Sequence, residues 1–274
     1  MFKLIPFVSA IITSFKQQYN YLTGDYNGLG LGNYAKIFND EFFFQALGNT
    51  AIYVIFVVAL VIIIGLPIAW CLYRTKRGSA FFQTAIFLPF VTSDIAVGLS
   101  WRLMFNDNGI INTLLGGANI GWLTDANVSL ITLVIFGVWS GLPLAILIYL
   151  CAMLNLDNNV INAARADGAS DMKILFKIVI PNIMPTILMT IVTTSITAWL
   201  EMNALFPLFS GRPGPYYNLF TMVYYIYSKI LEGRYAFGLA CAASVILFMC
   251  ICVFLLLRII LSAKNKQRRH YEQN

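Results

Sequence analysis

The sequence predicts an all-α integral membrane protein, and both its composition and its long apolar segments indicate this class. Of its 274 residues, 59% are hydrophobic and only 11% are charged, whereas soluble domains have roughly 45–50% apolar and about 25% charged residues. A soluble chain of this length needs more polar residues to cover its surface. The composition therefore argues against a soluble enzyme, a disordered chain or a nucleic-acid-binding protein.

The apolar segments give the order of the expected elements. A membrane-spanning helix needs about 20 mostly apolar residues. Five segments have this length: about 46–73, 81–105, 128–154, 183–206 and 236–261. Residues 1–15 are also apolar, but at 1.5 Å per residue they extend only about 22 Å, and no small-residue cleavage site of a signal peptide follows them. We interpret this segment as a first span that looks clipped at its N-terminus, which makes about six spans.

The distribution of lysine and arginine predicts the orientation of these spans. The turn after the second span, the loop at 155–182 and the C-terminal tail together carry ten of these residues, and the opposite side carries five over a longer stretch of chain. Cytoplasmic loops are enriched in lysine and arginine. Six spans with both termini in the cytoplasm fit this distribution. Five spans, with the N-terminus outside, are the alternative.

Few residues have the chemistry of a catalytic or metal site. The five cysteines lie in apolar stretches without zinc-type spacing, and the single histidine, His270, lies in a basic tail. The chain contains no Gly-x-x-x-x-Gly-Lys-Ser/Thr phosphate loop. We therefore expect no catalytic residue, no metal site and no cofactor bound by this chain.

Charged and helix-breaking residues inside the spans indicate a path or a polar interior. Asp94 and Glu201 would each cost about 2.5–3.5 kcal/mol at a helix centre that faces lipid, so we expect them to face the bundle interior, a cavity or a partner. Pro67, Pro89 and Pro143 each remove a backbone donor within a span. Kinked helices along a transport path and ordinary packing of a helical bundle both explain these prolines.

The loop at 155–182 has the pattern of two helices joined by a glycine. One of Asp157, Asn158 and Asn159 can cap the first helix, and Ser170 can cap the second. Gly168 suits the left-handed residue at which the first helix ends. Small alanines beside the glycine would let this elbow seat deeply in a groove, so the pattern predicts a docking module for another protein.

At these residues the chain resembles the permeases of binding-protein-dependent ABC importers. Their "EAA" loop is similar to Ala163-Ala164-x-x-Asp167-Gly168-Ala169 followed by Phe176-x-Ile178-x-Ile180-Pro181. The resemblance extends over nearly the whole chain. The marks of the sugar-type branch (maltose, glycerol-3-phosphate and multiple-sugar permeases, here their first, maltose-F-like subunit) are Gly32-Asn33-Tyr34, Asn49-Thr50, Phe87-Leu88-Pro89, Trp101-Arg102-Leu103-Met104-Phe105 and Gly211-Arg212-Pro213-Gly214.

The chain departs from this family at two places. Asn162 replaces the leading glutamate of the loop, which we expect to weaken a charged contact with the ATPase. The first span, 1–15, is shorter than that of the family, which raises the possibility of a misplaced start or an incomplete chain.

The resemblance implies a type I ABC importer permease fold with cytoplasmic coupling helices, in a single transmembrane permease domain over residues 1–274. It implies a second permease subunit in a heterodimer, two ATP-binding subunits that use ATP and Mg, and an external solute-binding protein, all at a bacterial inner membrane. The implied ATPase-coupling residues are Asn162, Ala163, Ala164, Asp167, Gly168, Ala169, Phe176 and Pro181. The implied substrate-path residues are Gly141, Leu144, Trp199, Glu201 and Asn203.

The resemblance thus predicts a transporter subunit, not an enzyme, that moves a carbohydrate delivered by the solute-binding protein. A Trp face beside hydrogen-bonding neighbours suits a sugar, although Trp199 would equally serve as an interfacial anchor. One alternative is a permease for a non-sugar solute such as a polyamine or glycerol-3-phosphate. Another is a secondary transporter, for which Asp94 and Glu201 would have to couple ions.

Overall fold

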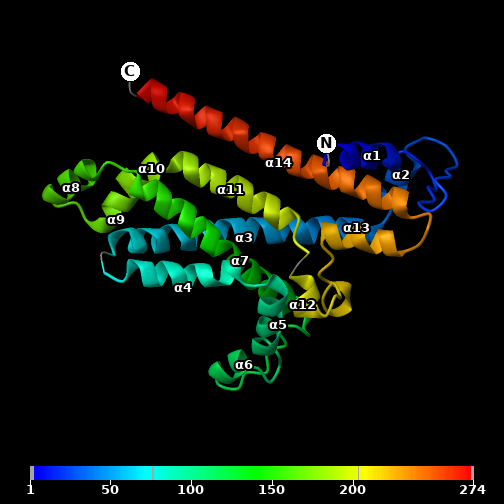
Figure 1. Ribbon diagram of the computed structural model, residues 1–274, viewed down its shortest axis with the longest axis horizontal. Coiled ribbons are helices and arrows are strands. Elements are labelled where there is room, and N and C mark those ends of the chain that lie inside the picture. Colours follow the sequence, from blue (N-terminus) through cyan, green and yellow to red (C-terminus); the bar gives the residue numbers. More distant parts are fainter. Residues whose placement is uncertain (1–2, 76, 203, 273–274) are drawn as a thin grey trace. The chain divides into compact units, whose positions relative to one another are not determined.

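The predicted all-α fold is confirmed. The computed structural model describes the backbone of residues 3–75, 77–202 and 204–272, and the side chains among them up to residue 256 except that of Asp94. Within this part of the chain the regular structure is helical (Figure 1), and the β pairing consists of one isolated bridge between Lys16 and Leu29.

The chain forms two compact units, Met1–Thr50 with Phe220–Asn274, and Ala51–Leu219. The helices of the first unit are α1 (Leu4–Ser14), α2 (Gly32–Phe38), the beginning of α3 (Glu41–Arg74), α13 (Met222–Leu231) and α14 (Phe237–Glu272). The second unit contains the rest of α3. Its other helices are α4 (Ser79–Val91), α5 (Asp94–Met104), α6 (Ile110–Leu114), α7 (Ala126–Leu154), α8 (Asn158–Ala166), α9 (Asp171–Ile174), the π-helical η1 (Leu175–Val179), α10 (Ile180–Asn182), α11 (Met184–Trp199), α12 (Leu205–Phe209) and the short 3-10 turn η2 (Pro215–Tyr217).

Three helices of the described chain are long and apolar enough to cross a membrane, and the number is five if each of two bent helix pairs is counted as one span. The three helices are α3, α7 and α14, and they coincide with the expected spans at 46–73, 128–154 and 236–261. The sixth expected span, 1–15, corresponds to α1, an apolar helix of 11 residues. Its crossing of the membrane stays a prediction.

The segment 81–105, expected as one helix, is broken into α4 and α5, which are bent by 101° with respect to one another. Thr92 and Ser93 between them have extended backbone, with ψ of 154° and 124°. Pro89, in the last turn of α4, has no N–H to donate to the preceding turn. The apolar composition of both halves concealed this break.

The segment 183–206 also differs from a single straight span. Its helix α11 begins after a 74° bend at Ile183 and ends at Trp199. Pro185 lies in the first turn, where a missing donor is tolerated. Beyond the helix, the Glu201 carboxylate accepts a hydrogen bond from the Ala204 backbone N–H at 2.9 Å, which holds the chain in a turn.

In the first unit a charged cluster joins α13 to the start of α3. The Asp40 carboxylate accepts a hydrogen bond from the Tyr225 hydroxyl at 2.8 Å and pairs with Lys229 at 3.0 Å. Burial opposes ionisation of Asp40, but these two contacts outweigh it and lower its pKa. Burial also opposes the charge of Lys229, yet the hydrogen bonds to Glu232 and Asp40 raise its pKa.

These shifts predict how stability depends on pH. A lowered carboxyl pKa contributes stability above the unfolded value of about 3.9, and this is lost as pH falls through the folded pKa. A raised lysine pKa contributes stability below about pH 10.4, and this stability is lost as pH rises through the folded pKa.

We expect Asp40→Asn to lower the free energy of unfolding by about 1–3 kcal/mol at neutral pH, and we expect this loss to shrink toward pH 3. Melting temperatures in detergent from pH 3 to 7 measure this, with the exposed Asp25→Asn as control. A cost that does not change with pH would contradict the role of the charge.

Candidate functional site

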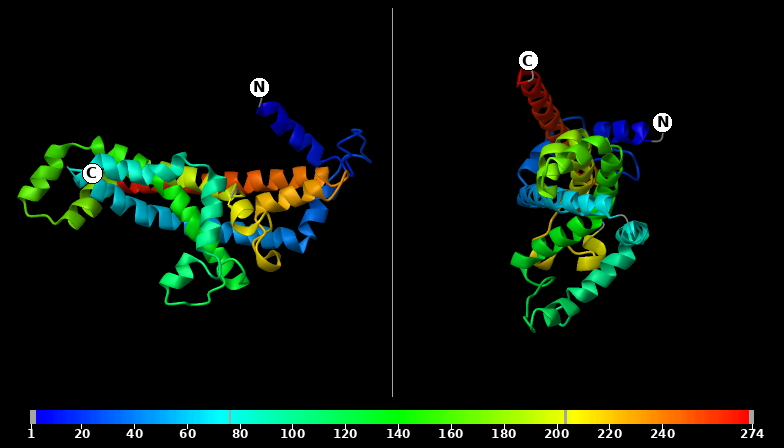
Figure 2. Two further views of the ribbon diagram at one scale, coloured as in Figure 1. Left: turned by 60° about the horizontal axis from the view of Figure 1, so that its bottom comes forward. Right: turned by 90° about the vertical axis from the view of Figure 1, so that its left-hand side faces the viewer.

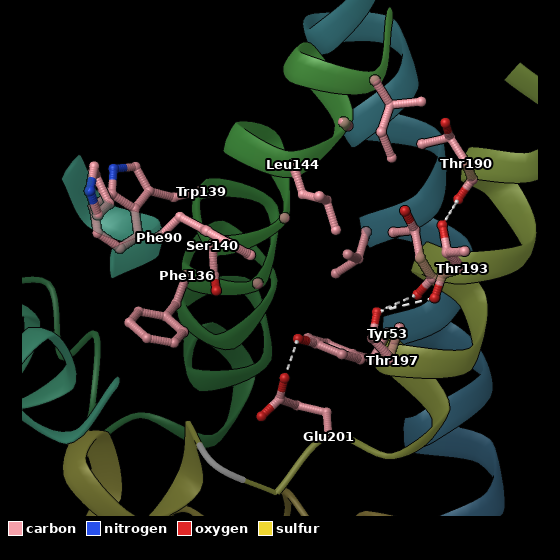
Figure 3. A pocket seen from close by; sticks show the side chains of 18 of the residues that line it. Tyr53, Phe90, Phe136, Trp139, Ser140, Leu144, Thr190, Thr193, Thr197 and Glu201 are labelled. Carbon is pink, nitrogen blue, oxygen red and sulfur yellow. Dashed lines mark hydrogen bonds between the residues drawn. The ribbon is translucent and has the colours of Figure 1, made fainter. Parts of the chain in front are cut away.

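A cavity of about 320 Å³ lies within the second unit, between α3, α4, α5, α7 and α11. Its two sides have different chemistry (Figure 3). Phe90, Phe136 and Trp139 form an aromatic side, and a row of threonines on α11 forms the opposite side. Tyr53 and Glu201 lie beside one another at one end. A mainly apolar lining with a few convergent polar groups is typical of a small-molecule site.

The threonines occupy consecutive turns of one face of α11. Thr190, Thr193, Thr194 and Thr197 line the cavity, and their positions i, i+3, i+4 and i+7 place them on the same face. Thr190, Thr193 and Thr197 donate their hydroxyl protons to backbone carbonyls of their own helix at 3.1 Å, 3.0 Å and 2.9 Å respectively. Because the oxygen lone pairs are not used by these bonds, each hydroxyl can accept a hydrogen bond from a ligand.

Among the residues that the structure describes, Glu201 supplies the carboxylate of this lining, which otherwise consists of apolar, aromatic, hydroxyl and glycine residues. One carboxylate oxygen accepts the Tyr53 hydroxyl at 3.4 Å, and the other accepts the Ala204 N–H at 2.9 Å. Tyr53 itself is 1% exposed. The carboxylate thus faces the interior with protein donors, as expected for a charge within a span.

The structure brings three of the five predicted substrate-path residues to the cavity. Gly141, Leu144 and Glu201 are part of its lining. Trp199 is not: it is 8% exposed, and its indole N–H has no hydrogen-bond partner among the described residues. This burial does not favour an interfacial anchor. Asn203 lies outside the described residues, as does the Asp94 side chain.

Sequence reasoning missed the threonine face, Tyr53 and Trp139. The threonines had a readable signal, because four polar residues at helical spacing inside an apolar segment form a stripe on one face. Trp139 is two residues before the predicted Gly141 and one turn after Phe136. Tyr53 had no such signal, because its position depends on how α3 packs against distant parts of the unit.

The predicted pair of helices around a glycine is confirmed in the loop at 155–182, which we call the coupling segment. Asp157 caps α8 by accepting the Asn159 N–H, and Ser170 caps α9 by accepting the Lys173 N–H. Gly168 between them has φ of +76°, a left-handed conformation that glycine adopts without strain. Figure 2 shows α8 and α9 at one end of the second unit, close to the ends of α3 and α4.

The coupling segment has a buried side and an exposed side. Ile161, Ile174 and Leu175 are at most 2% exposed and hold it against the unit. The predicted coupling residues Asn162, Ala163, Asp167, Gly168 and Phe176 are exposed, and Ala164, Ala169 and Pro181 are half-buried. The large apolar side chains Val160, Met172 and Phe176 are 50–61% exposed. Large apolar side chains that stay exposed along a short segment of chain favour a protein interaction site.

The described residues contain no group of three or more His, Cys, Asp or Glu side chains that could hold a metal ion. The described residues of the cavity lining offer hydrogen bonding, aromatic contact and one carboxylate to a ligand.

Comparison with known proteins gives consistent matches. A family model described as "Binding-protein-dependent transport system inner membrane component" matches residues 58–266. The chain is 29% identical to the lactose transport system permease protein LacF of Rhizobium radiobacter, over 86% of this chain and 82% of LacF. It is 31% identical to the probable ABC transporter permease protein MG188 homolog of Mycoplasma pneumoniae, over 100% and 86% of the two chains.

Two further matches are informative. The arabinooligosaccharides transport system permease protein AraP of Halalkalibacterium halodurans is 29% identical over 96% of this chain and 83% of AraP. A chain in the crystal structure of a bacterial ABC transporter involved in the import of the acidic polysaccharide alginate superposes with a TM-score of 0.78 at 19% identity, covering 96% of this chain and 90% of that chain. At this identity the likeness is one of fold.

The packing around Tyr53 gives a prediction about two glycines. A Cβ atom at Gly137 of α7 would overlap the Tyr53 hydroxyl and ring, whereas at Gly65 of α3 it would meet neighbours at 3.5 Å or more. We expect Gly137→Ala to destabilise by about 1–3 kcal/mol through overpacking. Gly65→Ala should be neutral or stabilising because alanine favours helix. Thermal unfolding of the two variants in detergent tests the difference, and equal melting temperatures would contradict the packing described.

Proposed function

Because the chain belongs to the family of binding-protein-dependent transport system inner membrane components, we propose that it is a permease subunit of an ATP-driven importer that moves a carbohydrate. As a member of this family it is a multi-pass membrane protein of the transport machinery and not an enzyme. It has the predicted type I ABC importer permease fold. The proposal takes residues 1–274 as one permease domain, because α3 belongs to both compact units.

The cavity carries the carbohydrate part of the proposal. A sugar offers apolar C–H faces surrounded by hydroxyl groups. Phe90, Phe136 and Trp139 supply aromatic contact, and the threonine oxygens can accept hydrogen bonds from the hydroxyls. The names of LacF and AraP state that these relatives transport lactose and arabinooligosaccharides. That agreement supports a sugar as the solute of this chain.

The charge of the cavity favours a neutral sugar over the alternative solutes. Glu201 is the carboxylate of the described lining, so an anionic solute such as glycerol-3-phosphate would meet a like charge in a site of low dielectric constant. A polyamine, which is cationic, would meet an opposite charge, and Glu201 is the observation in its favour. One carboxylate among hydroxyl and aromatic groups suits a neutral sugar better than a polycation. The family does not favour a secondary transporter that works alone.

The proposed assembly follows from the family and from the coupling segment. A solute-binding protein delivers the sugar from outside, as in the alginate importer solved with its ligand-bound periplasmic protein. A second permease subunit completes the path as a heterodimer. Two ATP-binding subunits use ATP and Mg and dock on the exposed side of the coupling segment in the cytoplasm, where both termini of this chain also lie.

The threonine face generates a test of the substrate path. Thr193→Val keeps the shape of the side chain and removes its oxygen, so we expect a two- to tenfold loss of apparent affinity for uptake, about 0.5–1.5 kcal/mol for one hydrogen bond. Thr186→Val, on the same helix but outside the cavity lining, is the matched control. Uptake of radiolabelled neutral oligosaccharides into proteoliposomes with the complete transporter measures both. Spermidine uptake in place of sugar uptake would instead establish the polyamine alternative.

Two glycines of equal geometry test the coupling segment. Gly168 and Gly116 have φ of +76° and +77°, and neither has a neighbour within 4 Å of an added Cβ. Valine in this conformation costs roughly 1–2 kcal/mol at either position, so the strain is matched. We expect only Gly168→Val to abolish substrate-stimulated ATP hydrolysis while the protein still inserts in the membrane. Normal stimulation in Gly168→Val, or equal loss in both variants, would rule out the assignment.

A further inference from the structure

The cytoplasmic end of α3 is joined to both arms of the coupling segment. The Tyr73 hydroxyl donates to the Asn158 side-chain oxygen at 2.7 Å, and the Arg74 guanidinium pairs with the Asp171 carboxylate at 2.8 Å. Asn158 is the first residue of α8, and Asp171 is the first residue of α9. We call these four residues the α3 clamp. It joins the last two residues of one long helix to the start of each helix beside the elbow.

The two α3 side chains of the clamp are held in place by a buried ring. Trp70, which is 4% exposed, stacks on Tyr73 with ring centroids 5.4 Å apart and planes at 19°. The Arg74 guanidinium lies 5.9 Å from the centre of the same ring. Tyr73 and Arg74 are therefore oriented before they contact the coupling segment, which reduces the entropy lost when the two contacts form.

The same helix reaches the cavity at a point far from the clamp. Tyr53 and Val57 of α3 line the cavity, and Tyr53 donates to Glu201. Twenty residues separate Tyr53 from Tyr73, which is about 30 Å along a helix. One continuous helix joins them, with no break of the kind found at Ile183, although Pro67 removes one of its backbone hydrogen bonds. A displacement of one end along the axis therefore reaches the other end.

The direct route along the chain is less suited to carry a movement. From α9 to the threonine face it passes through the π-helical η1 and then through the 74° bend at Ile183. Irregular helix and a bend are where a chain absorbs displacement. A movement of the coupling segment along this route alone would be taken up at the bend before it reached Thr190.

We propose that α3 conveys the movement of the coupling segment to the cavity, with Tyr73 and Arg74 as the positioning residues that bind α8 and α9 to its end. Tyr53 is the residue through which α3 acts on Glu201. In this arrangement α3 moves the end of the cavity at which Tyr53 meets Glu201 when the coupling segment moves. The inference rests on the proposed function, because it requires an ATPase docked on the coupling segment.

Charge reversal at the clamp tests the inference in the assembled transporter in proteoliposomes. Arg74→Asp places a second carboxylate opposite that of Asp171, and the two repel each other. We expect substrate-stimulated ATP hydrolysis and the amount of sugar transported per ATP each to fall about fivefold. Basal hydrolysis and apparent sugar affinity should stay unchanged, because neither the ATPase nor the cavity is altered. The double variant Arg74→Asp/Asp171→Arg restores the pair and should restore coupling. Arg74→Lys, which keeps the positive charge, should retain most of the coupling.

Two controls separate this inference from the loss of stability and from the proposed function. Arg77→Asp makes the same charge change three residues further on, at an exposed arginine, and should couple normally. Melting temperatures of all variants identify any that fail to fold. Normal coupling in Arg74→Asp, or no recovery in the double variant, overturns the role of the clamp. If Gly168→Val also couples normally, the proposed function itself is wrong, whereas uncoupling by Gly168→Val alone leaves it intact.

Discussion

The requirement that every backbone donor and acceptor be satisfied away from water determines most of this structure. In hydrocarbon the unpaired groups of a broken helix have no solvent to bind, so irregular backbone is tolerated only inside protein or beside a cavity. Two breaks in the spans, at Thr92–Ser93 and after Trp199, adjoin the cavity, because Phe90 and Glu201 are both part of its lining. The break at Ile183 instead follows the coupling segment. The cavity and the coupling segment thus lie where the helices are interrupted.

The same requirement explains the choice of polar groups in the cavity. A threonine satisfies its own hydroxyl by donating to a carbonyl of its helix, so a stripe of threonines can exist in an apolar segment with no partner elsewhere. A carboxylate has no proton to donate in this way, and Glu201 accepts hydrogen bonds from the Tyr53 hydroxyl and the Ala204 backbone N–H. The cavity therefore combines groups that need no external partner with one charge that the surrounding fold must support.

Local patterns were readable from the sequence, and contacts between distant segments were not. Gly168 and Ser170 act within a few residues of themselves, so their roles as elbow and cap followed from residue type, and the structure selects Asp157 from the three predicted caps of the first helix. Tyr53 and Glu201 are 148 residues apart, and no pattern of apolar residues specifies that meeting. The break between α4 and α5 was hidden for a related reason. Both halves are equally apolar, and the backbone angles at Thr92 that separate them leave no mark in composition.

The weakness of the clamp contacts is consistent with a part that must move. Arg74 and Asp171 are each 42% exposed, and exposed ion pairs contribute only about 0–1 kcal/mol, so the pair adds little to the stability of the folded unit. A buried and fully desolvated pair would fix α3 and the coupling segment in one arrangement, because breaking it would cost several kcal/mol. An importer that alternates between two states needs contacts whose free energies differ between those states by only a few kcal/mol. Orientation by Trp70 gives the clamp its geometry, and solvent exposure keeps its contacts reversible.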